Sequence, residues 1–281
     1  MAAPQADRRA YSLVAVLVSL VWAAAVQAEE EPLLQFGLGL GAIAFEDYRG
    51  SSTVHAYPLP VPYLLYHGKL LRSDRDGVRG TLFDQDWVEL NMSGDLTTPV
   101  RKDRERSGMP DLKSTLALGP SLDFHLLRSA DSNINFDVRL PLHAAFTVEA
   151  APKYIGWTFT PRLALDVTDP LGFSGWHAGF LVGPLFADRR YHGYFYTVAE
   201  QYATSSRPAY QAAAGYAGAQ AITALSKRFP RYWLGAYVRA DSLSGAAFAD
   251  SPLVQRTRYW SAGIGFAWII HTSAQMVEVS P

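Results

Sequence analysis

Apolar and polar residues alternate along residues 133–148 with a strict period of two. Every even position, from Ile134 to Val148, is apolar, whereas most of the odd positions are polar. Successive side chains of a β-strand point to opposite faces, so this alternation predicts one strand with an apolar face and a polar face. An average strand has only about five or six residues, whereas a tilted strand that crosses a bilayer needs roughly nine to eleven. The stretch is therefore predicted to span a membrane.

About ten strand-like segments, which short turns and longer loops join alternately, lie along the chain. They are residues 33–45, 54–73, 78–96, 112–127, 133–148, 154–167, 176–186, 210–226, 233–241 and 259–270. At least four others share the alternation of residues 133–148 clearly, whereas the facing of residues 210–226 is ambiguous. Backbone groups in lipid must all be paired, so such strands must close on themselves. The predicted fold is an all-β, antiparallel, up-and-down transmembrane β-barrel of about ten strands. Twelve is the alternative, because residues 54–96 hold either two strands or four.

The alternative to a membrane barrel is a soluble β-barrel like that of the lipocalins. Its apolar face would be turned inward and its outer face would be polar. Here the apolar face carries the large aromatics, as in the last segment with Trp260, Phe266 and Trp268. The membrane barrel is therefore favoured. An even strand count also places both termini on the periplasmic side.

Glycines and prolines recur at alternate positions in the first two segments. Gly37, Gly39 and Gly41 share one face of residues 33–45, and part of this run scans like a dinucleotide-binding fingerprint. That interpretation is rejected, because the alternation continues and no helix follows. The glycines instead predict a narrow lumen or a close backbone approach. Three prolines on one face of residues 54–73 weaken the ladder of that strand.

Composition excludes several classes of protein. Charged residues make up 18% of the 281 residues, below the average of about 25%, and aromatic residues make up 13%. The absence of cysteine excludes disulfides, thiolate metal sites and cysteine catalysis. The net charge of −1 provides no basic surface for nucleic acid.

The N-terminus carries a targeting signal. Arg8 and Arg9 precede an apolar run that ends in small residues at positions 26–28, so residues 1–28 are predicted to be a cleaved signal peptide. An uncleaved membrane anchor is the alternative. Residues 29–270 are then the barrel, in the outer membrane. Residues 271–281 form an extension beyond the aromatic residues at which such barrels commonly end.

Charged and histidine side chains recur on the inward faces of the predicted strands. We interpret them as an electrostatic network that fills the lumen, because opposite charges in a confined space pair with each other. A barrel of about ten strands is also not much wider than one of about eight, whose interior side chains can fill. The predicted network comprises Asp123, His125, Asp137, Arg139, His143, Arg162, Asp166, Arg239 and Asp241.

Catalytic and metal-binding interpretations of these residues are weaker. His125, His143 and His177 are candidate metal ligands, but no H-E-x-x-H or G-x-S-x-G motif is present. A bulge or a turn explains the pair Asp84 and Asp86. The sequence thus predicts no catalytic residue, no metal ligand and no cofactor, and the protein is not expected to be an enzyme.

The glycine-rich first strand and several short motifs resemble those of the MipA/OmpV family of outer-membrane proteins along nearly the whole mature chain. They are Tyr48-Arg49-Gly50-Ser51, Pro58-Leu59-Pro60, residues 108–112, residues 183–185, residues 194–198, residues 207–210 with Gly215-Tyr216, and residues 245–254. The resemblance implies a scaffold for a murein-cleaving lytic transglycosylase and a murein-synthesising penicillin-binding protein, or a surface adhesin. A narrow porin-like channel is the alternative function. No catalytic residues come with this family.

The same motifs provide candidate residues for binding a partner. They are Tyr48, Arg49, Gly50, Met109, Pro110, Tyr194, Tyr196, Asp250, Ser251 and Pro252. The tyrosine-rich loop from Tyr191 to Tyr202 is either an adhesive surface or part of the aromatic girdle of the barrel. The expected partners are outer-membrane lipid and a murein hydrolase and synthase, and no nucleic acid is expected.

Overall fold

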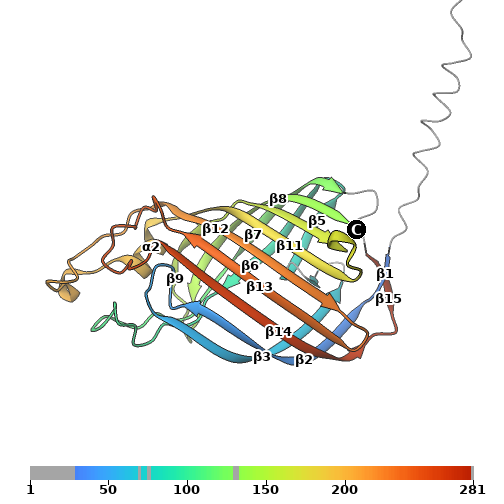
Figure 1. Cartoon of the computed structure of the whole chain (residues 1–281). Helices are drawn as coiled ribbons and strands as arrows, with labels where there is room; N and C mark the ends of the chain where they lie inside the picture. Colours follow the sequence, from blue (N-terminus) through green and yellow to red (C-terminus); the bar gives the residue numbers. More distant parts are fainter. Residues whose placement is uncertain (1–28, 69–70, 75–76, 129–132, 280–281) are drawn as a thin grey trace, which may run out of the picture.

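A computed structural model describes residues 29–68, 71–74, 77–128 and 133–279 of the chain. In this part of the chain, thirteen antiparallel segments form one sheet (Figure 1). The segments are β2 (Leu34–Glu46), β3 (Val54–His67), β4 (Leu71–Asp74), β5 (Gly77–Gln85), β6 (Val88–Leu96), β7 (Thr115–Arg128), β8 (Ile134–Thr147), β9 (Tyr154–Phe159), β10 (Arg162–Thr168), β11 (Trp176–Ala187), β12 (Gly215–Arg228), β13 (Tyr232–Ser242) and β14 (Arg258–Thr272).

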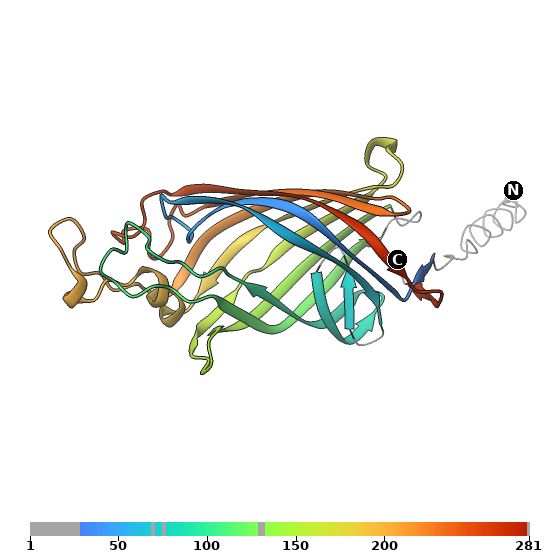
Figure 2. The same cartoon turned by 90° about the horizontal axis from the view of Figure 1, so that it is seen from below.

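β9 and β10 are two halves of one strand, because both pair with β8 on one side and with β11 on the other. The strand is interrupted at Thr160 and Pro161, where the proline has no N–H to donate. Thirteen segments less one therefore make twelve strands within the described residues. The sheet also returns on itself, since β14 pairs with β2 and β8 pairs with β10 (Figure 2).

The predicted up-and-down antiparallel barrel is confirmed, with the alternative count of twelve strands rather than ten. The difference arises between residues 54 and 96, which hold four strands. A tight turn at Asp86 and Trp87 separates β5 from β6, so the single segment predicted for residues 78–96 is two strands. The other additional strand is β4, which the prediction joined to β3 in the segment 54–73.

The two faces of the strands follow the predicted alternation. On β8, Asp137 and His143 are buried at odd positions, whereas Ile134 and Leu142 are exposed at even positions. Exposed apolar side chains form a belt around the outside, including Leu40, which is 71% exposed, and others at Leu38, Trp260, Ile264, Trp268 and Ile270. An apolar surface of this kind is unfavourable in water and matches the lipid-facing band of a membrane barrel. None of the helices in the described residues is long and apolar enough to cross a membrane.

The glycines of β2 lie where two backbones approach closely. A Cβ atom at Gly39 would lie 1.7 Å from the carbonyl oxygen of Phe266 and 2.4 Å from the Cα of Ala267, both on β14. At Gly37 it would lie 2.1 Å from the carbonyl oxygen of Trp268. The predicted close approach is therefore present, and only glycine fits these positions.

The first and last described strands meet at the end of the barrel that carries the short turns. β1 (Glu29–Pro32) pairs with β15 (Met276–Val279) as a separate two-stranded sheet (Figure 1). The C-terminal extension thus pairs with the first residues after the predicted cleavage site, and β14 runs two residues past the expected limit at 270. The predicted signal peptide, residues 1–28, lies outside the described residues.

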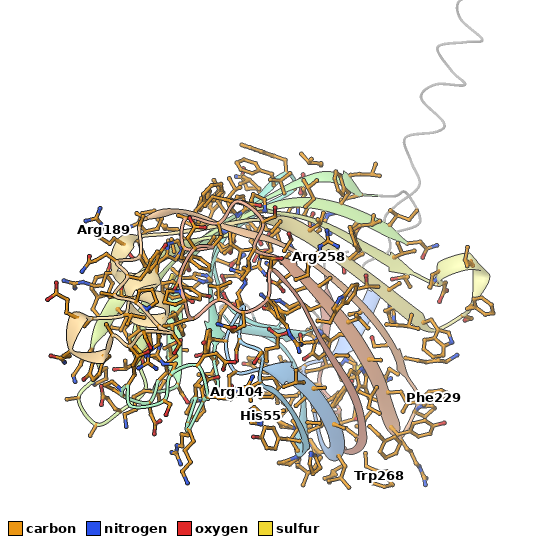
Figure 3. All side chains as sticks on the ribbon, turned by 60° about the vertical axis from the view of Figure 1, so that its left-hand side comes forward. His55, Arg104, Arg189, Phe229, Arg258 and Trp268 are labelled. Carbon is orange, nitrogen blue, oxygen red and sulfur yellow. The ribbon has the colours of Figure 1, made fainter. Side chains whose placement is uncertain are left out.

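The long loops lie at the opposite end, which we call the loop end. Arg104 and Arg189 are on this side of the molecule, and Phe229 and Trp268 are on the other (Figure 3). The loop end also holds α2 (Arg189–Tyr196) and the short helix η3 (Glu200–Tyr202). The sequence predicted only a loop here. The missed signal is the N-cap residue Asp188, whose Oδ1 accepts a hydrogen bond from the backbone N–H of Tyr191 at 2.8 Å.

Candidate functional site

The loops at the loop end pack around a hydrophobic core of their own. We call residues 47–53, 97–114, 188–214 and 243–257 the loop cap. Phe248 lies at its centre and is completely buried. Its ring stacks on that of Tyr196 with the centroids 3.7 Å apart and the planes 7° apart, and the ring of His192 meets it edge-on at 4.7 Å. Buried aromatic rings contribute large apolar areas, so this cluster joins α2 to the 243–257 loop. Around it pack Tyr48, Val100, Leu112, Phe195, Val198, Ala212, Leu243, Ala246 and Leu253.

Hydrogen bonds also join the loops of the cap to one another. The Tyr48 hydroxyl donates to the carbonyl oxygen of Leu253 at 2.9 Å. The Ser251 hydroxyl donates to the carbonyl oxygen of Tyr196 at 2.7 Å, and the Tyr196 hydroxyl donates to that of Arg49 at 2.9 Å. These side chains therefore satisfy buried backbone carbonyls of loops that are far apart in the sequence.

A second set of bonds fixes the 97–114 loop. The Ser51 hydroxyl donates to Asp103 Oδ2 at 3.0 Å, and Arg106 Nη1 donates to the carbonyl oxygen of Phe195 at 2.8 Å. Arg207 reaches the same loop from the far side, where its Nη1 donates to the carbonyl oxygens of Glu105 and Ser107. All the longer loops of the cap are thus bonded to each other.

The predicted partner-binding residues lie mostly inside this cap. Tyr48, Gly50, Tyr196 and Ser251 are buried, and Arg49, Met109, Tyr194 and Pro252 are partly buried. Only Pro110 and Asp250 are exposed. Most of the motif residues in these loops are therefore explained by packing within the cap, and a partner-binding role stays a prediction for the two exposed residues.

Arg49 connects the cap to the lumen. Its Nε donates to Asp241 Oδ1 at 2.9 Å, and its Nη1 donates to the carbonyl oxygen of Ala217 at 2.8 Å. Asp241 also accepts two hydrogen bonds from Arg239, at 2.5 and 2.9 Å. Three of the residues that the sequence singled out separately, Arg49, Arg239 and Asp241, thus form one ionic cluster beneath the cap.

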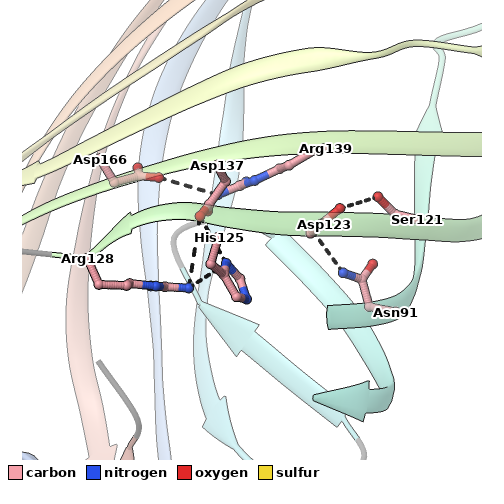
Figure 4. A network of polar contacts seen from close by, with 8 residues as sticks. All are labelled: Asn91, Ser121, Asp123, His125, Arg128, Asp137, Arg139 and Asp166. Atoms are coloured by element: carbon pink, nitrogen blue, oxygen red, sulfur yellow. Dashed lines mark hydrogen bonds and ion pairs between the residues drawn. The ribbon is translucent and has the colours of Figure 1, made fainter. Parts of the chain in front are cut away.

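The other predicted lumen residues form a network on β6, β7, β8 and β10 (Figure 4). Asp137 accepts from His125 Nδ1 at 2.9 Å and from Arg139 Nη2 at 3.3 Å. Arg139 Nη2 also lies 3.3 Å from Asp166 Oδ2. The neighbouring Asp123 accepts from Asn91 at 2.9 Å and from Ser121 at 2.5 Å. Acidic and basic groups therefore pair across adjacent strands.

His143 and Arg162 are the two remaining residues of the predicted lumen network. His143 is almost fully buried, with its Nε2 3.0 Å from the Ser93 hydroxyl and its Nδ1 3.2 Å from Asp95 Oδ2. Arg162 Nε has no hydrogen-bond partner among the described residues. Sequence reasoning did not assign Asn91, Ser93 or Asp95 to the network, although Asn91 and Ser93 alternate along β6 in phase with Glu89.

One cluster in the described part of the chain offers metal-ligand atoms. Asp84, Glu89 and His125 each place one such atom within 4.8 Å of the others. Asp84 is exposed and Glu89 is buried, and His125 is already bound to Asp137 through its Nδ1. Carboxylates and imidazole of this kind suit a divalent cation. Asp86, paired with Asp84 in the sequence interpretation, lies in the β5–β6 turn and not in this cluster.

His192 makes the loop cap sensitive to pH. Its Nδ1 lies 2.7 Å from the carbonyl oxygen of Ala213, so this nitrogen carries the proton and donates. Burial among aromatic rings lowers the pKa of His192 below its usual value of 6.5. A folded-state pKa below the unfolded one stabilises the cap above about pH 6.5, and this contribution is lost as the pH falls.

We expect the α2 amides to exchange faster at about pH 5 than at about pH 7.5 after correction for intrinsic rates, because protonated His192 disfavours the packed state. His192→Asn keeps a donor for Ala213 and cannot be protonated, so it should remove this dependence.

Burial also raises the pKa of Asp103 to about 6, which stabilises the cap towards lower pH and opposes the effect of His192. The difference between the native chain and His192→Asn isolates the histidine, and equal profiles would contradict its role.

Comparison with known proteins finds one matching family and solved structures of low sequence identity. The family described as MltA-interacting protein MipA matches residues 38–270. The P. putida toluene transporter TodX is 13% identical over 86% of this chain and 68% of its own, with a TM-score of 0.29. The outer membrane protein OprG from Pseudomonas aeruginosa is 10% identical over 88% of this chain and 99% of its own, with a TM-score of 0.24. No curated protein matches the chain.

Proposed function

This chain belongs to the family of MltA-interacting proteins, MipA, and from that premise we propose that it anchors a murein-cleaving enzyme of the MltA type at the outer membrane. The family and the barrel fold make it an outer-membrane β-barrel protein. Murein lies in the periplasm, so the partner must bind at the end with the termini and short turns. The proposal extends to a murein synthase as a second partner at the same end.

One rigid turn at this end supports the proposal. Residues 169–175 include η2 (Pro170–Gly172) and present two apolar side chains to solvent, with Leu171 96% exposed and Phe173 63% exposed. Asp169 Oδ1 accepts a hydrogen bond from the N–H of Gly175 at 2.5 Å, and the N–H of Gly172 bonds to the carbonyl oxygen of Asp169 at 3.0 Å. A preformed apolar tip loses little entropy on binding, as the anchor residues of protein interfaces require.

The backbone of this turn is strained in a way that favours a role in binding. Asp169 and Leu171 both have left-handed conformations, with φ values of 53° and 56°. Non-glycine residues adopt this region at a cost of about 1–3 kcal/mol. In this conformation the Leu171 side chain points outward and makes no packing contribution to the fold.

The alternative functions have less support in the structure. A surface adhesin would bind through the loop cap, but most motif residues of the cap are buried in its core. A narrow channel would need free charges along its path, whereas the lumen acids and bases described above pair with each other. Planar-bilayer recording tests the channel function. A stable conductance that Arg139→Gln alters would favour a channel over the anchor role.

Replacing Leu171 by aspartate and Phe173 by serine should abolish capture of a purified MltA-type lytic transglycosylase by the refolded barrel. The change removes the apolar tip without touching the strands, so heat-modifiable migration on a gel should stay normal. Ala209→Asp, an exposed change at the loop end, is the matched control and should bind normally. Capture that survives the double substitution would show that the enzyme binds elsewhere, and no capture by the native chain would exclude the anchor role.

A further inference from the structure

β3 is paired on one side only over its first half, residues 54–62, within the part of the chain that the structure describes. It pairs with β2 from Val54 to Tyr66, and its described pairs with β4 are at Tyr66 and His67. No strand of the described chain pairs with the other edge of residues 54–62. On the far side of the short β4–β5 hairpin, the ladder between β5 and β6 ends at Met92. Among the described residues, the sheet is therefore unpaired between β3 and β6 towards the loop end, and we call this unpaired stretch the opening (Figure 2).

The opening lies at the level of the lipid-facing belt. Pro60 of β3 is opposite Leu40 of β2, which is in turn opposite Phe266 of β14. One step nearer the loop end, Ala42 is opposite both Pro58 and Ile264, and Ile264 is 67% exposed. Because these positions belong to the apolar belt, the open edge of β3 faces the hydrocarbon core of the bilayer, where an unpaired backbone N–H is costly.

Three prolines adapt this edge to lipid. Pro58, Pro60 and Pro62 occupy alternate positions, and the β2–β3 ladder continues through all of them. In an antiparallel pair the N–H groups of alternate residues point to opposite edges, so an unbroken ladder requires the three proline nitrogens to point away from β2. The open edge therefore lacks three donors that lipid would leave unsatisfied. Proline also prevents another strand from pairing there.

The inner wall beside the opening is apolar. Leu59, Val61 and Tyr63 point inward, opposite Gly41, Gly39 and Gly37, and the Val61 side chain packs over Gly41. The ring of Trp233 on β13 lies 6.0 Å from that of Tyr63. The charged network lies on β6 to β10, and the ionic cluster of Arg49, Arg239 and Asp241 lies nearer the loop end, at β13. The opening thus has an apolar border on β3, whereas its β6 border carries the polar residues Ser93 and Asp95.

We propose that the opening between β3 and β6 is a binding site for the acyl chain of a membrane lipid, which enters sideways and lies against Leu59, Val61 and Trp233. The occupant follows from the surroundings, because at this level the molecules beside the barrel are lipid chains. The apolar inner face of β3 offers the chain a surface continuous with the bilayer. The site is independent of enzyme anchoring at the short-turn end, so either proposal can fail alone.

Because the chain has no cysteine, one introduced cysteine can be labelled without removing any native residue. We choose Val61→Cys labelled with bimane, in vesicles of phosphatidylcholine with or without bromine on the acyl chains. Bromine quenches bimane on contact, so the emission should fall nearly as much as for Ile264→Cys on the lipid face. Ile222→Cys is the matched inward control on β12, opposite Arg239, and its emission should remain unchanged.

Each outcome of the labelling decides the proposal. Quenching at Val61 without quenching at Ile222 supports a lateral acyl-chain site. Equal emission of the Val61 label in both kinds of vesicle overturns it, and quenching at both inward positions overturns entry beside β3. Heat-modifiable migration verifies the fold of each labelled protein. If labelled Val61→Cys does not fold, Leu59→Cys on the same face of β3 provides the same test.

Discussion

Gly39→Val is expected to leave the chain unable to form the folded barrel. The added Cβ would lie 1.7 Å from the carbonyl oxygen of Phe266 and 2.4 Å from the Cα of Ala267. Both atoms belong to the backbone of β14, so no change of rotamer relieves the contact. Overpacking usually costs about 1–3 kcal/mol, and here the β2–β14 ladder itself must separate. Because this ladder joins the first and last strands of the barrel, its loss leaves two strand edges unpaired in lipid.

Migration on a detergent gel, before and after boiling, measures this effect after refolding into micelles. The native chain should show a heat-modifiable band, and Gly39→Val should not. Leu40→Val is the control, because it changes the next residue of the same strand, which is 71% exposed on the lipid face. A folded band for Gly39→Val in the native amount would contradict the close approach of β2 and β14.

Phe248→Ala is expected to open the loop cap while the barrel stays folded. Removing a fully buried phenylalanine costs about 3–5 kcal/mol, and here it also removes the stacking partner of Tyr196 and the edge-on contact with His192. The cap is made of loops bonded mainly to each other, whereas the strands have their own ladders. The loss therefore falls on the cap.

Limited proteolysis of the protein in micelles tests this separation. Phe248→Ala should be cleaved rapidly in residues 188–214 and 243–257, and its heat-modifiable migration should remain native. Asp250→Ala, two residues further on and exposed, should be as resistant as the native chain. If Phe248→Ala resists the protease equally, the cap does not depend on this ring. Binding of an MltA-type enzyme at the opposite end should be unaffected in either variant.

In the lumen network, the sequence pattern of a strand indicates which face a side chain is on but not which residue it pairs with. Alternation along each strand correctly placed Asp123, Asp137, Arg139 and His143 on the inward face, because the direction of a side chain depends on its position in the strand. The pairing of Asp137 with both His125 and Arg139 depends on the register between β7 and β8. Register is a relation between strands, so alternation within one strand does not determine it.

The loop motifs show the opposite case. Polar and aromatic residues in loops, such as Tyr48, Tyr196 and Ser251, are typical of exposed binding surfaces, and we predicted that role from the sequence. The structure buries all three, because loops separated by up to 205 residues meet and satisfy each other's carbonyl groups. Burial of a loop residue depends on what packs over it, which no local pattern contains.

The sequence alone determined that this chain is a barrel with an apolar outside, because a period of two assigns each side chain to a face whatever the strand pairs with. The glycines of the first strand left a narrow lumen and a close backbone approach as alternatives, and the structure decided for the close approach at Gly39. The tertiary structure alone decided the count of twelve strands, the closed loop cap and the opening beside β3. Prolines 58, 60 and 62 are visible in the sequence, but only the pairing of the strands reveals which edge they leave without donors.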